Sequence, residues 1–213
     1  MGPVRYRPIA PDLLVAELAD RIAGVNADGR VRVALDGAPA AAPDRLGAAL
    51  VDPLRVRGRP AVHLRSTDFL RPASLRYEQG RTNPDSYYLG WLDEAGLRRE
   101  VLEPAGPSGS GRILPTLWNA ETDRASRAGY LGLPDRSVVL VSGPFLLGGP
   151  LPFDLSVHLA LSPAALARRA AERDRWTLPA YRRYAEEVDP VALADLAVRV
   201  DDPRHPALLL PPG

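Results

Sequence analysis

The stretch Val31-Arg-Val-Ala-Leu-Asp-Gly37 decides the fold that this sequence predicts. It is a short, largely apolar run rich in β-branched residues, which is typical of a strand buried inside a parallel sheet, and it ends at a glycine. Residues 38–46 then lead into an apolar helical pattern. A buried strand, a loop that starts at glycine and a helix, in this order, are the setting of a Walker A phosphate-binding loop.

The residues that bind phosphate in such a loop are missing here. The motif runs G-x-x-x-x-G-K-[ST], and Gly37 fits its first position. Ala42 then stands at the second glycine, Pro43 at the lysine and Asp44 at the hydroxyl residue that binds magnesium. Pro43 offers neither an ammonium group nor an N–H, and Ala42 resists the positive φ that glycine allows. Because the carboxylate of Asp44 would also repel phosphate, the sequence predicts a degenerate phosphate loop.

Composition limits what could replace the lost groups. The chain has 213 residues, of which 46% are hydrophobic and 25% charged, so we expect one globular domain over residues 1–213. All 27 basic residues are arginine, which excludes Schiff-base and lysine-base chemistry. Without cysteine there is no disulfide, thiol nucleophile or thiolate metal site, and three scattered histidines make no metal signature. We therefore expect no metal site.

Charge and hydropathy also bear on partners. The formal net charge is +1, and no basic run is interleaved with aromatic residues, so nucleic acid is not an expected partner. No apolar stretch near the start resembles a signal or a membrane span, so we expect a cytoplasmic protein with no membrane partner. A small-molecule ligand is the expected partner, and the sequence leaves the oligomeric state open.

Strands and helices alternate along the chain, which predicts a three-layer α/β domain with a mainly parallel five-stranded sheet. The expected strands are 31–36, 60–66, 137–142, 154–160 and 196–200, and the expected helices are 12–22, 44–55, 91–102, 163–173 and 180–187. Residues 106–111 are predicted to form a flexible loop and 112–118 a strand or hairpin. The proline-rich ends are predicted to fray.

Several motifs together resemble the bacterial uridine-kinase-like branch of the P-loop kinases. They are Ser66–Pro72, Arg76–Arg81, Pro84–Tyr88, Leu97–Arg99, Arg168–Asp174, Asp189–Pro190 and Asp201–Pro203. None is specific alone, but their order and spacing cover about residues 12–204. The resemblance implies a P-loop-kinase-like fold, with a lid and insertion region around 70–125 and 163–187.

The resemblance also implies roles for individual residues. Asp68, in the Asp-Phe pair after the second strand, would be the general base for an acceptor hydroxyl, although it could merely cap the turn. Arg169 and Arg173 would border the lid that closes on ATP, although a solvated, salt-bridged helix face explains them equally well. Further residues expected to line the cleft are Arg71, Arg76, Tyr77, Arg81, Tyr87, Tyr88, Trp118 and Glu121.

Two departures from the family pattern add to the altered phosphate loop. Ser142-Gly143 stands where the family has an acidic residue that helps organise magnesium. Asn119, Ala120 and Glu121 stand where an Asp-His-Arg cluster contacts the acceptor nucleoside. His63 and His158 lie within apolar strands and are interpreted as core residues rather than catalysts. Both sides of the implied reaction centre are therefore changed.

Three functional hypotheses follow from the sequence. The favoured one is a kinase-fold protein that has lost ATP and keeps the acceptor cleft for a small, nucleoside-like molecule, as a pseudokinase or a repurposed biosynthetic enzyme without a cofactor. The second is an active kinase that uses ATP and magnesium, with Arg45 or Arg71 replacing the lysine; Asp44 argues against it. The third is a noncatalytic interaction protein, which retention of Asp68 makes less favourable.

Overall fold

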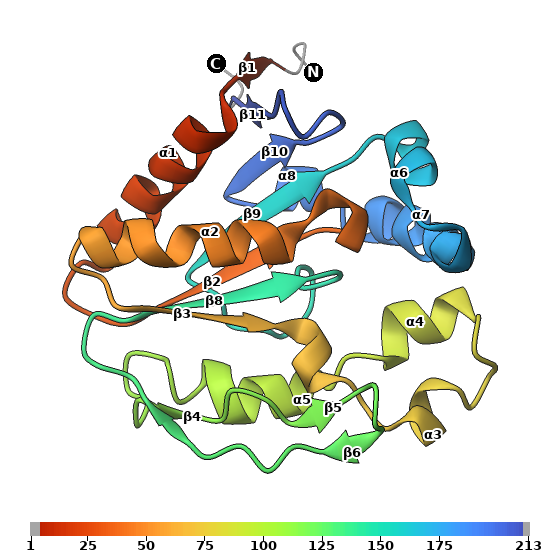
Figure 1. The fold of residues 1–213 in the computed structure, drawn as a ribbon, viewed down its shortest axis with the longest axis horizontal. Coiled ribbons are helices and arrows are strands. Elements are labelled where there is room, and N and C mark those ends of the chain that lie inside the picture. Colours follow the sequence, from red (N-terminus) through yellow and green to blue (C-terminus); the bar gives the residue numbers. More distant parts are fainter. Residues whose placement is uncertain (1–4, 211–213) are drawn as a thin grey trace.

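A single mixed sheet runs through the computed structural model, which describes residues 5–210 (Figure 1). Its strands lie in the order β1-β11-β10-β9-β2-β8-β3. Their bounds are Tyr6–Pro8 (β1), Val31–Asp36 (β2), Ala61–Arg65 (β3), Val138–Gly143 (β8), Leu155–Ala160 (β9), Leu196–Arg199 (β10) and Ala207–Leu209 (β11). The strands from β10 to β3 are parallel, and β11 and β1 add an antiparallel edge.

Helices cover both faces of this sheet. The α-helices are α1 (Pro11–Gly24), α2 (Pro43–Val56), α3 (Ala73–Arg76), α4 (Pro84–Gly90), α5 (Glu94–Leu97), α6 (Pro163–Arg169), α7 (Leu178–Glu187) and α8 (Pro190–Leu193). Short 3₁₀ turns, η1 (Pro39–Ala41), η2 (Ser66–Phe69) and η4 (Glu172–Thr177), and a π-helical turn, η3 (Arg98–Leu102), join them. Within the described residues, no helix is long and apolar enough to cross a membrane.

The strand β2 separates two hydrophobic cores. Val33 and Leu35 point into a cluster that contains Leu18 and Leu50 from α1 and α2. Ala34, between them, belongs to the second cluster, which includes residues of α5 and η3. This alternation follows from the two-residue period of a strand. The predicted three-layer α/β fold with a mainly parallel sheet is confirmed, and β2 and β8 are direct neighbours in it.

The structure corrects several local predictions. The predicted fraying of the proline-rich ends falls partly on residues 1–4 and 211–213, which lie outside the described residues. Within residues 5–210, Tyr6–Pro8 pairs with Ala207–Leu209 and extends the five parallel strands to seven. The helix expected at 91–102 begins only at Glu94, since the side chain of Asp93 caps it by accepting the N–H of Gly96. An N-cap residue lies outside the helix, so the earlier residues cannot join it.

Two further segments differ from the prediction. The helix expected at 163–173 ends at Arg169, and a separate 3₁₀ turn follows it. The segment 112–118 does not form one hairpin. Its first part, β4 (Arg112–Ile113), pairs with β7 (Leu131–Gly132), whereas β5 (Trp118–Asn119) pairs with β6 (Arg124–Ala125).

The parallel strands end together at one edge of the sheet. In Figure 1 the arrowheads of β2, β3, β8 and β9 point to the same side, where α6 and α7 lie above and α3 and α4 below. Ligands of open α/β sheets bind outside this carboxyl edge. Helices α3 and α4 and the region from α6 to α7 lie at this edge, whereas Leu102 and Gly109 contact Arg32 and Arg30 at the opposite, amino end of β2. The role of segments 70–125 and 163–187 as a lid stays a prediction.

Candidate functional site

The loop after β2 uses its own N–H groups. The N–H of Ala41 donates to the carbonyl of Ala38 over 2.7 Å, and that of Ala42 donates to the carbonyl of Pro39 over 2.9 Å. Pro39 and Pro43 have no N–H. Phosphate loops bind anions through several free N–H groups that converge on the ligand. The N–H groups of Ala41 and Ala42 are therefore not available to a phosphate.

The backbone of this loop nevertheless keeps one feature of a glycine-containing turn. Ala42 lies in the left-handed region, with φ 60° and ψ 48°. A residue with a Cβ pays roughly 1–2 kcal/mol for that conformation. Alanine disfavours a positive φ, as expected from the sequence, but the fold imposes this conformation on Ala42.

The side chains where magnesium residues were expected satisfy one another instead. The hydroxyl of Ser142, at the end of β8, donates to the carboxylate of Asp44 in the first turn of α2, and the Nε2 of His63 lies 2.7 Å from the same hydroxyl. The Ser142 hydroxyl has one hydrogen, which it donates to Asp44. The Nε2 of His63 must therefore carry a hydrogen and donate it to the oxygen of Ser142. Burial lowers the pKa of His63, which favours this neutral ring. No group of three or more metal-ligating residues occurs among residues 5–210.

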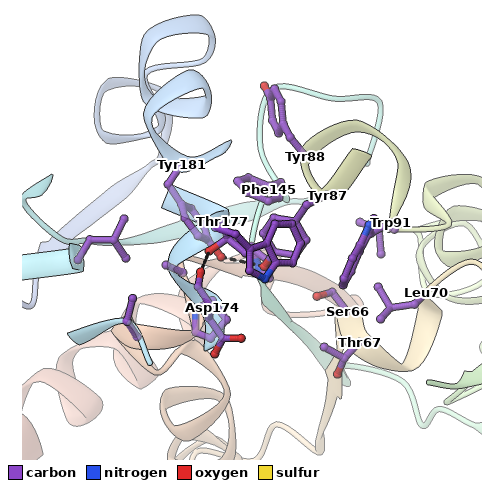
Figure 2. Close-up of a pocket in the computed structure, with 18 of the residues that line it drawn as sticks. Ser66, Thr67, Leu70, Tyr87, Tyr88, Trp91, Phe145, Asp174, Thr177 and Tyr181 are labelled. Carbon is purple, nitrogen blue, oxygen red and sulfur yellow. Dashed lines mark hydrogen bonds between the residues drawn. The ribbon is translucent and has the colours of Figure 1, made fainter. Parts of the chain in front are cut away.

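A cavity of about 450 Å³ opens beside this loop (Figure 2). Its walls come from η1, η2, α4, the segment after β8, and the region from α6 to α7. The lining residues are Ala38, Pro39, Ala40, Ser66, Thr67, Leu70, Tyr87, Tyr88, Leu89, Trp91, Leu92, Glu94, Pro144, Phe145, Leu166, Arg169, Ala170, Ala171, Asp174, Trp176, Thr177 and Tyr181. We call it the aromatic cavity, because six of these side chains carry rings.

Tyr87 lies at the centre of the rings. Its ring centroid is 5.0 Å from that of Trp91, 5.3 Å from that of Phe145 and 5.5 Å from that of Trp176, all in edge-on geometry. Its hydroxyl is 2.9 Å from that of Tyr181. Burial raises the pKa of Tyr87 and Tyr181, so both hydroxyls stay protonated at neutral pH. The cavity thus combines flat apolar surfaces with neutral hydrogen-bonding groups.

Two details distinguish this cavity from ordinary packing. Phe145 adopts a φ of 61°, which is uncommon for an aromatic residue and is often found at ligand sites. The Nε1 of Trp91 is buried and has no hydrogen-bond partner within the described residues. Buried donors without partners are rare, so this nitrogen is unusual, although it is closed off from the cavity space.

The structure brings only some of the predicted site residues to this cavity. Tyr87, Tyr88 and Arg169 line it. Arg76 and Tyr77 stand behind Trp91 instead: the guanidinium of Arg76 lies 4.9 Å from the Tyr77 ring centroid and 5.2 Å from that of Trp91. These residues support the wall without lining it.

Asp68 lies next to the cavity. Its neighbours Ser66 and Thr67 line the wall, whereas its own carboxylate forms an ion pair with Arg65 over 3.0 Å. The backbone carbonyl of Asp68 accepts the N–H of Leu117. The carboxylate pairs with Arg65 and accepts no N–H of the turn among the described residues. The catalytic role of Asp68 stays a prediction.

The other predicted residues lie further out. Arg81 is exposed, with its guanidinium 5.2 Å from the ring centroid of Tyr77, and Arg173 is exposed near Asp174. Trp118 donates its Nε1 hydrogen to Asp123, and Glu121 is in an exposed turn. Arg45 and Arg71 are exposed and line neither of the two cavities that we describe. The structure leaves their roles untested.

The sequence analysis missed Trp91, Phe145, Trp176 and Tyr181 as site residues. The only available signal was their aromatic character among few aromatic residues. No spacing rule links them, because Tyr87 and Tyr181 are 94 positions apart. Their meeting depends on how α4 and α7 pack across the carboxyl edge of the sheet.

Comparison with known proteins identifies the fold. No family model matches the sequence, and no curated protein sequence matches it significantly. Among solved structures, a possible uridine kinase from Bacillus stearothermophilus superposes with a TM-score of 0.70 at 21% identity, covering 86% of this chain and 96% of that one. A protein described as a fructose transport system kinase from a Silicibacter species gives 0.58 at 22%, covering 87% and 92%.

These likenesses define the chain as an α/β protein with the P-loop kinase fold. The predicted resemblance to uridine-kinase-like proteins is therefore confirmed at the level of the fold. Sequence identities of 21% and 22% support a shared fold but not a shared activity. Any activity must therefore be inferred from the residues of the site.

Proposed function

We propose that this chain is a kinase-fold protein that no longer uses ATP and magnesium, and that it binds a planar, nucleoside-sized molecule in the aromatic cavity. It would act as a pseudokinase or as a repurposed biosynthetic enzyme, without a cofactor. The loss of ATP binding is inferred from the phosphate loop. Two of its residues are prolines, which have no N–H, and the N–H groups of Ala41 and Ala42 are hydrogen-bonded within the loop.

Loss of phosphate transfer follows from what that chemistry needs. Phosphoryl transfer depends almost entirely on positioning and on neutralising charge. Here Pro43 stands at the lysine position, and Asp44 brings a negative charge whose partner is the hydroxyl of Ser142. Losing one charge-assisted contact costs about 1.5–3 kcal/mol, so losing several costs many powers of ten in rate.

The ligand class follows from the aromatic cavity. Flat rings around Tyr87 favour a planar molecule, because aromatic groups gain energy from stacked and edge-on contacts. Arg169, in the wall, would add a charged donor for a ligand oxygen. Since one structural neighbour is described as a possible uridine kinase, uridine is the natural first probe.

Calorimetry with two probes tests both parts. We expect Mg-ATP to bind at millimolar concentration or more weakly, and uridine to bind more tightly than Mg-ATP. The Tyr87→Ala variant should weaken uridine binding at least tenfold, while the matched control Tyr130→Ala, at an exposed tyrosine outside the cavity, should not. Micromolar affinity for Mg-ATP would refute the loss of ATP, and equal effects of both variants would refute the ligand site.

A restoration experiment tests the cause of weak nucleotide binding. Changing Ala42→Gly, Pro43→Lys and Asp44→Thr together supplies the residues of the Walker A motif. If only those groups are missing, the triple variant should bind Mg-ATP more tightly than the unmodified chain. An unchanged affinity would mean that another part of the site also excludes ATP.

A further inference from the structure

A second cavity of about 640 Å³ lies against β9, α6, α7 and α8. Most of its wall is apolar and includes Leu161, Leu178 and Val191. It shares Ala38, Leu166 and Tyr181 with the aromatic cavity, so the two spaces adjoin. We call it the histidine cavity, because His158 is part of its wall.

His158 is held by a carboxylate in the core. Its Nδ1 lies 2.6 Å from the Oδ2 of Asp36, whose side chain is completely buried. The N–H of Leu146 and the hydroxyl of Tyr184 also donate to Asp36. Because the Asp36 carboxylate accepts hydrogen bonds from these donors, the Nδ1 of His158 carries a hydrogen and donates it to Asp36.

In the neutral imidazole the other ring nitrogen of His158 is an acceptor, and the residue forms part of the wall of the histidine cavity. His158 is 8% exposed and lines this cavity. Its Nε2 makes no hydrogen bond within the described residues, and it is not among the buried polar atoms that lack a partner, so solvent reaches it. An acceptor in apolar surroundings is costly unless something donates to it.

We propose that the histidine cavity is a second ligand site, which binds a largely apolar molecule carrying a hydroxyl group that donates to the Nε2 of His158. Asp36 acts as the positioning residue, because it fixes the tautomer and the orientation of the ring. The apolar walls take up the body of the ligand, and the Nε2 of His158 selects the hydroxyl. This site is separate from the function proposed for the aromatic cavity.

The chain contains a second histidine–aspartate pair, His205 and Asp202, which lies at the surface and not in a cavity wall. The Nδ1 of His205 lies 2.9 Å from a carboxylate oxygen of Asp202, but the side chain of His205 is 75% exposed. His205 lines neither cavity. It is therefore a matched control: a histidine paired through the same nitrogen, with water instead of an apolar wall around it.

The test uses two probes of similar shape, 1-naphthol and 1-methylnaphthalene, which differ in the hydroxyl. Titration of the unmodified, ¹⁵N-labelled chain should shift the Nε2 resonance of His158 with 1-naphthol but not with 1-methylnaphthalene, and leave that of His205 unchanged. We expect 1-naphthol to bind at least tenfold more tightly, which is the worth of about one such hydrogen bond.

Variants make the assignment specific. His158→Phe keeps a ring but removes the acceptor, so the preference for 1-naphthol should fall to within twofold, whereas His205→Phe should keep it. Equal binding of both probes, no binding up to their solubility limits, or an unchanged His158 resonance in the unmodified chain would each overturn the proposal. The resonance measurement decides even if His158→Phe fails to fold.

Discussion

Ser142 at the end of β8 donates a hydrogen bond of 2.5 Å to Asp44 at the start of α2. In the Walker A pattern the loop carries the hydroxyl, and in the resembling family the strand end carries the acid. Here the two groups have exchanged places, and they bind each other across the carboxyl edge. This pair therefore occupies the region where the resemblance implies magnesium.

The exchange predicts the outcome of a double-mutant cycle. Ser142→Asp alone would place a second carboxylate against Asp44 in a fully buried position, and should destabilise the protein by about 1–3 kcal/mol more than the uncharged Ser142→Asn. Adding Asp44→Ser restores one acid and one hydroxyl, and should recover at least half of the difference. Urea unfolding measures each term; a double variant as unstable as Ser142→Asp would contradict the pairing.

Ala42→Gly should stabilise the folded state. Glycine removes the left-handed strain of about 1–2 kcal/mol at φ 60°, but its unfolded chain has more entropy to lose, so we expect a net gain of about 0.5–1 kcal/mol. The control Ala40→Gly, at a neighbouring position without a positive φ, should destabilise. Equal losses in both variants would show that Ala42 is not strained.

Gly47→Ala should destabilise the protein, although alanine normally favours a helix interior by about 1 kcal/mol. A Cβ at Gly47 would overlap the imidazole of His63, which Ser142 holds in place. We expect a loss of about 1–3 kcal/mol, as for other overpacked sites. Gly24→Ala, where a Cβ would meet nothing within 4 Å, is the control, and truncation by His63→Ala should relieve the clash.

Stability should fall on acidification because of His63. Burial lowers the pKa of His63 below the ordinary value of 6.5. Just below pH 6.5 the unfolded chain therefore binds a proton at His63, whereas the folded chain does not. The free energy of unfolding should therefore drop as pH falls from 7 through 6.5, and level off once the folded state is also protonated. Urea unfolding at several pH values should give a flatter profile for His63→Gln but not for His205→Gln.

Asp68→Asn tests the implied base at the rim of the aromatic cavity. If Asp68 accepts a ligand hydroxyl, the variant should weaken uridine binding about tenfold. Its exposed ion pair with Arg65 contributes little stability, so the melting temperature should barely change. The control Asp52→Asn removes a similar surface pair with Arg55, three residues away in sequence. Unchanged uridine affinity would leave Asp68 with only its surface ion pair to Arg65 and would refute its role toward the ligand.

The sheet could be predicted because each of its central strands has a recognisable local sequence pattern. Each central strand, such as Val31–Asp36, is an apolar run bounded by turn residues, and parallel order follows from the intervening helices. Pairing of Tyr6–Pro8 with Ala207–Leu209 could not be predicted, since two three-residue segments carry no local signal for a partner about 200 residues away.

The sites were harder to predict than the sheet. A degenerate phosphate loop could be predicted because a motif fixes its spacing, and it stays a prediction; the hydrogen bonds of Ser142 depend on tertiary contact and could not be predicted. His158 was interpreted as a core histidine, and it is indeed buried. What sequence could not supply is the direction of its second nitrogen, which depends on the packing of α6, α7 and α8 around it.

Tyr181 has a ring in the wall of both cavities and a hydroxyl bonded to Tyr87. One side chain cannot adapt independently to two occupants. If both cavities bind ligands as proposed, a ligand that shifts this ring would change the affinity of the other cavity, and thermodynamic reciprocity would require the second ligand to affect the first by the same factor. The shared tyrosine would then make the two proposed sites a heterotropic pair, in which filling one cavity changes the binding constant of the other.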